Sequence, residues 1–171
     1  FQYFNWDVNK KQVLRKDGAL YQMSPWALSW DDENYYLVAF EEEKSSIRHY
    51  RVDKIKDITV TEESRIILEK DRNFDVAEYC NRAFGMYCGD DETITVRFPN
   101  HLIGVVIDRF GKEVNIYNSG DDSFETRLNV SVSPQLFGWL TGLGADVKIV
   151  RPERVVEQYK QYIQEIMKQY K

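Results

Sequence analysis

The feature that most constrains the fold of this 171-residue chain is a change of hydrophobic pattern near residue 75. As far as about Ile67, short apolar stretches alternate with turn-forming residues, which is typical of short β-strands. From Asp75 onwards, apolar residues recur at helical spacing in some segments and at strand spacing in others. The pattern therefore predicts two domains, 1–70 and 71–171.

The first domain is predicted to be a small, strongly bent β-barrel of five short strands. The run Tyr35–Phe40 is continuously apolar, so we expect a central strand that is covered on both faces. Lys16-Asp17-Gly18 predicts a hairpin, because glycine tolerates a positive φ. The charged stretch Glu41–Ser46 predicts a loop. The other expected strands are Phe1–Trp6, Lys11–Leu14, Trp26–Trp30 and Ile47–Ile58, the last one bent or split in two.

The second domain is predicted to run strand, helix, strand, strand, helix, strand and final helix, which is the order of a ferredoxin-like sandwich with a C-terminal helix. A short helix with capping-box spacing at Asp75 and Glu78 precedes it. Asn100–Phe110 combines strand propensity with helix-like ends, so both structures stay open there. The predicted fold class is mixed β and α+β. The remaining expected elements are strands at Thr93–Phe98, Glu113–Asn118, Phe124–Val130 and Val147–Val150, and helices from Ser133-Pro134 to Gly144 and from Pro152 onwards.

The charge balance argues against duplex DNA as the main partner of this chain. The net charge is −5, whereas a surface that binds duplex DNA is expected to be basic. Cys80 and Cys88 fit no zinc or redox spacing, and no apolar run approaches the length of a membrane span. We therefore expect a cytoplasmic protein with reduced thiols and no membrane contact.

Motifs for catalysis are missing from the sequence. The two histidines, His49 and His101, are not beside a nucleophile motif. Gly142-Leu143-Gly144 lacks the rest of a dinucleotide-binding fingerprint. The paired aspartates, such as Asp31-Asp32, fall in predicted turns, where carboxylates favour turn geometry. The sequence predicts no enzyme, no catalytic residue, no metal site and no cofactor.

One basic segment, Arg48–Lys56, stands out in this acidic chain. Strand alternation places Arg48 on one face and both His49 and Arg51 on the other. Because Arg48 shares its face with apolar neighbours, its guanidinium needs an anionic partner or a ligand. Two interpretations stay open: a salt bridge with the Glu41-Glu42-Glu43 run, or an anion site for phosphate or nucleic acid with Tyr36 or Trp26 as a stacking surface.

These residues also resemble a known family. Tyr35–Ala39, preceded by Ser24-Pro25 and Leu28, is similar to the segment that gives the WYL domain its name, with Tyr35 where the family usually has Trp. Arg48–Ile55 resembles the second signature of the family, with Lys54 in place of the usual Arg. The C-terminal half resembles the extension that follows WYL domains, through Phe84–Tyr87, Val96–Phe98, Ile107–Gly111, Gly138–Leu140, Gly142–Gly144 and Ile149–Glu153.

The resemblance to WYL-domain transcriptional regulators implies an Sm-like, SH3-type barrel that senses an effector and a ferredoxin-like extension that forms a homodimer. Such bacterial regulators carry an N-terminal helix-turn-helix, absent here, that binds operator DNA. The chain begins within an apolar stretch, so we expect a part of a longer protein. The implied effector is a nucleic acid or nucleotide. The implied ligand-binding residues are Ser24, Tyr36, Arg48, His49 and Arg51, with Lys54 as a further candidate.

Two other functions stay open beside the regulator. Sm-like barrels elsewhere bind single strands, so the chain could be a stand-alone single-stranded nucleic-acid-binding module. It could also be a protein-interaction module without a small ligand, in which the terminal helix and the Trp139 region hold a dimer.

Overall fold

The computed structural model describes residues 1–68, 75–86 and 89–170. The chain divides into two compact units, unit 1 at Phe1–Val76 and unit 2 at Ala77–Lys171. The predicted boundary at 70–71 and Cys88 lie outside the described residues. Each unit has its own buried cluster of hydrophobic residues, and each is described here by itself.

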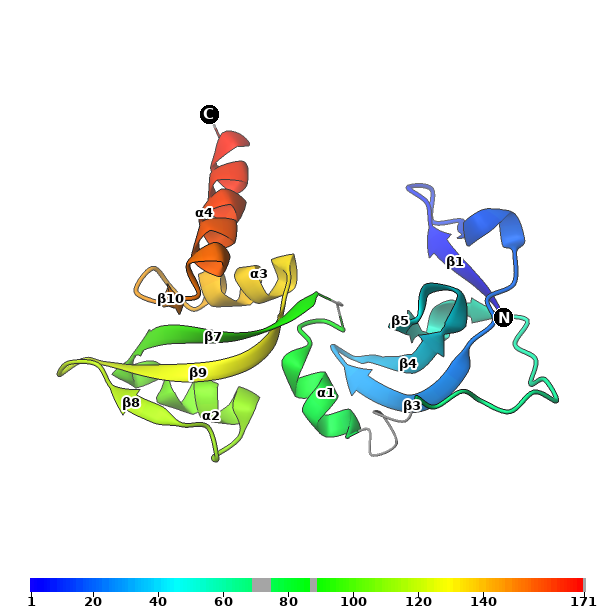
Figure 1. Cartoon of the computed structure of the whole chain (residues 1–171). Helices are drawn as coiled ribbons and strands as arrows, with labels where there is room; N and C mark the ends of the chain where they lie inside the picture. Colours follow the sequence, from blue (N-terminus) through cyan, green and yellow to red (C-terminus); the bar gives the residue numbers. More distant parts are fainter. Residues whose placement is uncertain (69–74, 87–88, 171) are drawn as a thin grey trace. The chain divides into compact units, whose positions relative to one another are not determined.

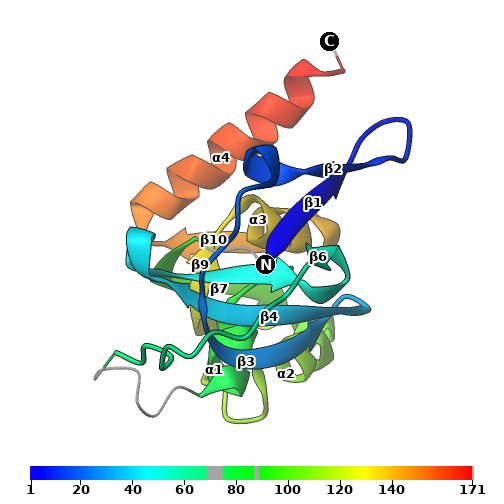
Figure 2. The ribbon, with the colours of Figure 1, turned by 90° about the vertical axis from the view of Figure 1, so that its right-hand side faces the viewer.

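Unit 1 contains two antiparallel three-stranded sheets, with strand orders β2-β1-β6 and β3-β4-β5. Figure 2 shows the β1–β2 hairpin, with β6 beside β1. The predicted segment Ile47–Ile58 is divided between β5 and β6, with a 3-10 turn between them. The strands are β1 (Gln2–Trp6), β2 (Gln12–Leu14), β3 (Ser24–Asp31), β4 (Asn34–Glu41), β5 (Ser46–Arg51) and β6 (Ile55–Lys56).

The apolar run predicted to be a central strand is β4, which lies between β3 and β5. Its second half is buried on both faces, because Val38 and Ala39 point to opposite sides and are both 0% exposed. Tyr3, Tyr21 and Tyr50 form a buried aromatic cluster in unit 1. Their rings meet edge to face at 5.2–6.2 Å between centroids, an arrangement that aromatic quadrupoles favour.

Two local predictions for unit 1 are wrong. Residues Arg15–Gly18 form a 3-10 turn in which Lys16 and Asp17 both have positive φ, and not a hairpin between strands. Glu41 ends β4 instead of opening a charged loop, and it is 2% exposed. The loop itself is short, because the 3-10 turn Glu42–Lys44 leads directly to β5.

Unit 2 is built on a four-stranded antiparallel sheet with strand order β10-β7-β9-β8 (Figure 1). The predicted sequence of strand, helix, strand, strand, helix, strand and final helix is observed. Asn100–Phe110, for which the sequence allows either a helix or a strand, is helical. The elements are α1 (Val76–Arg82), β7 (Asp90–Pro99), α2 (Ile103–Phe110), β8 (Ile116–Asn118), β9 (Ser123–Val132), α3 (Pro134–Gly142), β10 (Lys148–Arg151) and α4 (Glu153–Lys168).

One face of the unit 2 sheet is apolar and the other is polar. Ile94, Val96 and Phe98 alternate along β7 and are 0% exposed. They form one core cluster with residues of α2, α3 and α4, so the helices cover this face. On the opposite face Arg97 of β7 pairs with Glu125 of β9 at 2.7 Å. Strand alternation produces this division.

The predicted mixed architecture, with several antiparallel sheets and a C-terminal helix, is confirmed. The Sm-like name for unit 1 and the ferredoxin-like name for unit 2 stay predictions. No helix among the described residues is both long enough and apolar enough to cross a membrane.

Candidate functional site

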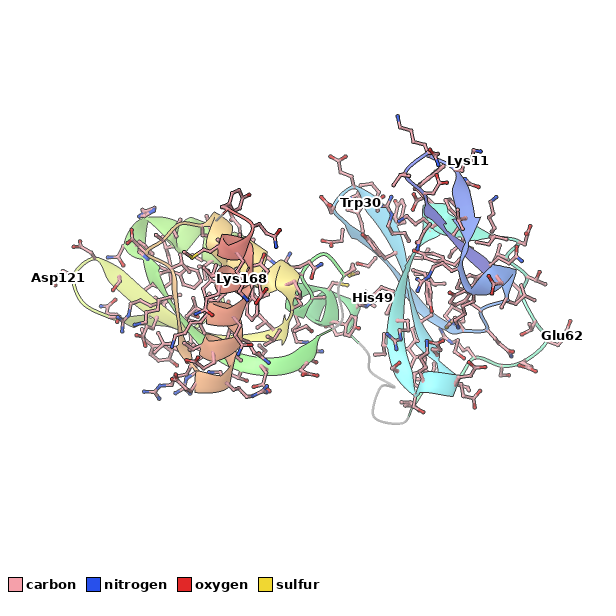
Figure 3. All side chains as sticks on the ribbon, turned by 90° about the horizontal axis from the view of Figure 1, so that it is seen from above. Lys11, Trp30, His49, Glu62, Asp121 and Lys168 are labelled. Atoms are coloured by element: carbon pink, nitrogen blue, oxygen red, sulfur yellow. The ribbon has the colours of Figure 1, made fainter. Side chains whose placement is uncertain are left out.

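The candidate site lies on the β3-β4-β5 sheet of unit 1, whose register determines which side chains share a face. Tyr36 is opposite Arg51, and Val38 is opposite His49. Residues opposite each other in adjacent strands point to the same side. Tyr36, His49 and Arg51 therefore lie together, and we call this side of the sheet the Tyr36 face. Figure 3 shows the side chains of this region and labels His49 on β5.

Ser24 joins the Tyr36 face because β3 is irregular. The register shifts between Pro25 and Ala27, so Ser24 is opposite Phe40 while Ala27 is opposite Val38. An uninterrupted strand would place Ser24 and Ala27 on opposite sides. Ser24 and Tyr36 are at opposite ends of the face, because four residues of β4 separate their register positions by roughly 13 Å.

Arg51 is held in place by a carboxylate two residues further along. Its Nε donates to Asp53 Oδ1 at 3.1 Å and its Nη2 donates to Oδ2 at 2.9 Å. These hydrogen bonds hold the pKa of Asp53 below its ordinary value. The pair is therefore intact at neutral pH and is lost only as the pH falls through the lowered pKa of Asp53. The Arg51 Nη1 has no hydrogen-bond partner among the described residues.

Tyr36 and Lys54 complete the surroundings of Arg51. Burial raises the pKa of the half-buried Tyr36 phenol, so its hydroxyl keeps its proton at neutral pH. The Arg51 guanidinium acts in the opposite direction and lowers this pKa, while the charges of Asp31, Asp32 and Asp53 raise it further. Lys54 lies in the 3-10 turn Val52–Lys54 that directly follows β5.

Arg48 is separated from the other predicted site residues. It lies opposite Ala39 on the other side of the sheet, which we call the Glu41 face. Its Nε is 3.3 Å from Glu41 Oε2, so the salt-bridge interpretation of Arg48 is confirmed. Lys44 and Lys16 also approach the Glu41 carboxylate, at 3.2 and 3.9 Å. One buried carboxylate thus holds three partly exposed cations together.

A segment that follows β6 covers the Ser24 end of the Tyr36 face. The Ile66 backbone N–H donates to Ser24 Oγ at 2.8 Å. Trp26 Nε1 donates to the Ile66 carbonyl at 2.7 Å, while its ring stacks on Phe40 with centroids 5.7 Å apart. Figure 3 labels Glu62, which precedes these contacts in the chain.

Sequence reasoning missed the contacts of Asp53 and Ile66, and it named Glu41 only as one of three acidic residues that could pair with Arg48. The burial of Glu41 could have been expected from its position at the end of an apolar strand, where a carboxylate needs partners. The two-residue spacing of Arg51 and Asp53 is visible in the sequence, but their hydrogen bonds form where β5 passes into the 3-10 turn Val52–Lys54. Nothing in the sequence signals the Ile66 contacts, which join residues 40 and 42 positions apart.

The described side chains do not form a metal site, since no group of three or more His, Cys, Asp or Glu residues is suitably placed within residues 1–68, 75–86 and 89–170. The Tyr36 face carries four polar groups: the Tyr36 phenol, the His49 imidazole, the Arg51 guanidinium and the Ser24 hydroxyl. Such groups bind anions and stack on planar rings.

We expect Glu41→Gln to lower the free energy of unfolding of unit 1 by about 1–3 kcal/mol, because it leaves three cations without their shared counter-charge. Denaturation with urea measures this change. The control is Glu42→Gln, which removes the same charge from an exposed neighbour. Equal effects of the two substitutions would show that the Glu41 cluster contributes no stability.

Two family models match separate parts of the chain. The family model of the WYL domain matches residues 1–60, and that of the WCX domain matches residues 90–167. No curated protein matches the chain significantly in sequence.

Among solved structures, the chain is similar to proteasome accessory factor B/C (PafBC) of Arthrobacter aurescens, with 16% identity and a TM-score of 0.41. The match covers 99% of this chain and 25% of that protein, so the chain spans about a quarter of its length. The two domain matches together cover most of the sequence. The chain belongs to the WYL-domain family, with a WYL domain followed by a WCX domain.

Proposed function

We propose that this chain is the effector-sensing and dimer-forming part of a transcription regulator. Unit 1 binds a phosphate-bearing ligand, either a nucleic acid or a nucleotide, and unit 2 pairs with a second copy. Operator DNA is bound by a helix-turn-helix domain outside this chain. The chain itself works without catalysis or a cofactor, and its expected location is the cytoplasm.

The observation that carries the ligand proposal is the common face of Tyr36, His49 and Arg51. A guanidinium bonds phosphate oxygens with directed N–H donors, and an aromatic ring stacks on bases. Asp53 orients Arg51 through Nε and Nη2, which leaves Nη1 for a ligand oxygen. An anchored guanidinium loses less side-chain freedom on binding than a mobile one.

Arg48 takes part only if the ligand is extended. Arg48 and Arg51 are on opposite sides of the sheet, but both belong to β5, which is an edge strand. A small anion on the Tyr36 face does not reach Arg48, whereas a strand of nucleic acid that crosses the β5 edge contacts both. Lys54, directly after β5, extends the same edge. This geometry favours an oligonucleotide over a single nucleotide.

A second candidate function is protein binding by the tip of the β3–β4 hairpin. Leu28, Trp30 and Tyr35 are 65%, 59% and 57% exposed, and the rings of Trp30 and Tyr35 are 4.7 Å apart. Exposed apolar groups of this kind are common at protein interfaces. The absence of any nucleic-acid binding would favour this alternative.

We expect Arg51→Ala to weaken binding of a short single-stranded oligothymidylate about tenfold or more, because a charge-assisted hydrogen bond to phosphate is lost. Fluorescence anisotropy with a labelled oligonucleotide measures the affinity at fixed salt concentration. The matched control is Arg97→Ala, which removes an equal charge from another arginine–carboxylate pair. Equal weakening by both variants, or no binding by the wild type, would contradict the proposed site.

The dimer proposal is supported by the end of α4. Ile166 and Met167, in the last turn of this helix, are 40% and 56% exposed, and Tyr170, just beyond its end, is 86% exposed. Exposed apolar side chains that are close together on a helix end are typical of a surface that another chain covers. The family resemblance independently associates this half of the chain with dimerisation.

Met167→Asp is expected to shift the chain from dimer to monomer, because a carboxylate would be desolvated in the contact. Sedimentation velocity measures the distribution of species. Gln164→Asp places the same charge on an exposed polar position of α4 and is expected to leave the dimer intact. A monomeric wild type would contradict the proposal.

A further inference from the structure

The backbone of Ile66 is bonded to two side chains of the strand that carries Ser24. Both polar groups of the Ile66 backbone are engaged by side chains of β3, with the N–H bonded to Ser24 Oγ at 2.8 Å and the carbonyl bonded to Trp26 Nε1 at 2.7 Å. A residue held at both its donor and its acceptor is positioned as a bound peptide would be.

The neighbours of Ile66 strengthen this attachment. Arg65 Nη1 donates to the Pro25 carbonyl at 3.4 Å, and Gln22 Nε2 donates to Glu63 Oε2 at 2.7 Å. The segment 63–66 is thus bonded to residues 22–26 along one stretch. The irregular register between Pro25 and Ala27 makes this stretch suitable for such contacts, because a bulge interrupts regular strand pairing.

The attached segment contacts Ser24, which is also a predicted ligand-binding residue. Its two glutamates carry negative charge, which is unfavourable for a phosphate-bearing ligand. The Ser24 hydroxyl belongs to the Tyr36 face, and the Ile66 N–H donates to its oxygen, so the segment lies beside the hydroxyl that a ligand would contact. The exposed carboxylates of Glu62 and Glu63 precede this contact and repel a phosphate group that approaches Ser24. A phosphate-bearing ligand that extends along the face from Arg51 to Ser24 therefore meets these carboxylates and favours release of the segment.

We infer that residues 62–67 are an autoinhibitory segment, which occupies the Ser24 end of the site until a phosphate-bearing ligand releases it. This inference rests on the proposed function of unit 1. The segment lies between the WYL and WCX matches in the chain. Ligand binding and segment attachment oppose each other, so each weakens the other by the same factor.

The test uses the whole chain, a labelled oligothymidylate and the substitution Trp26→Phe. Phenylalanine keeps an aromatic ring against Phe40 but removes the donor to the Ile66 carbonyl. We expect the variant to bind the oligonucleotide about fivefold more tightly, the factor that corresponds to one ordinary hydrogen bond. Trp30→Phe, at an exposed position outside these contacts, is the matched control and is expected to bind like the wild type.

A second measurement needs no variant. Arg65 is a trypsin site inside the attached segment, so cleavage after Arg65 reports on release. We expect the oligonucleotide to accelerate this cleavage in the wild type. An affinity of Trp26→Phe equal to that of Trp30→Phe, or a cleavage rate that the oligonucleotide leaves unchanged, would overturn the inference while the proposed function stands. Binding by none of the three proteins would overturn the proposed function and this inference together.

Discussion

The pairing of β4 with β3 and β5 is the interaction on which the candidate site depends. Because β4 is central, its register with both neighbours determines which side chains meet. It brings Tyr36 together with Arg51 on one face and Ala39 together with Arg48 on the other. A shift of one residue in the β4–β5 pairing would exchange the two arginines between faces. The apolar second half of β4, buried on both sides, opposes such a shift.

The two faces have different electrostatic arrangements, and this difference separates a structural role from a binding role. On the Glu41 face, a carboxylate that is 2% exposed gathers three cations, so Arg48 already has its counter-charge. On the Tyr36 face, Asp53 holds Arg51 by two hydrogen bonds at the surface. An exposed pair of this kind is only weakly stabilising, so a ligand can share the guanidinium at little cost.

Much of the fold could be predicted because hydrophobic periodicity is a local signal. The run Tyr35–Phe40 predicted the central strand, and Ser133-Pro134 predicted the start of α3, where Ser133 caps the helix by accepting from the Leu136 N–H.

The positive φ at Lys16 could not be predicted, since non-glycine residues rarely adopt it. The strand face of Ser24 depends on the bulge, and the burial of Glu41 depends on cations from other segments, so neither follows from alternation. The separation of His49 and Arg51 from Arg48 was predicted correctly, because it requires only that β5 is extended.

We propose that a phosphate-bearing ligand binds the Tyr36 face of unit 1. The most direct test is a titration of the isotope-labelled chain with a short single-stranded oligothymidylate, followed by NMR chemical shifts. We expect the largest shifts at Tyr36, His49 and Arg51, together with shifts at Ser24 and Ile66 as the 62–67 segment is released. Shifts confined to the surroundings of Glu41, or to the sheet of unit 2, would contradict it.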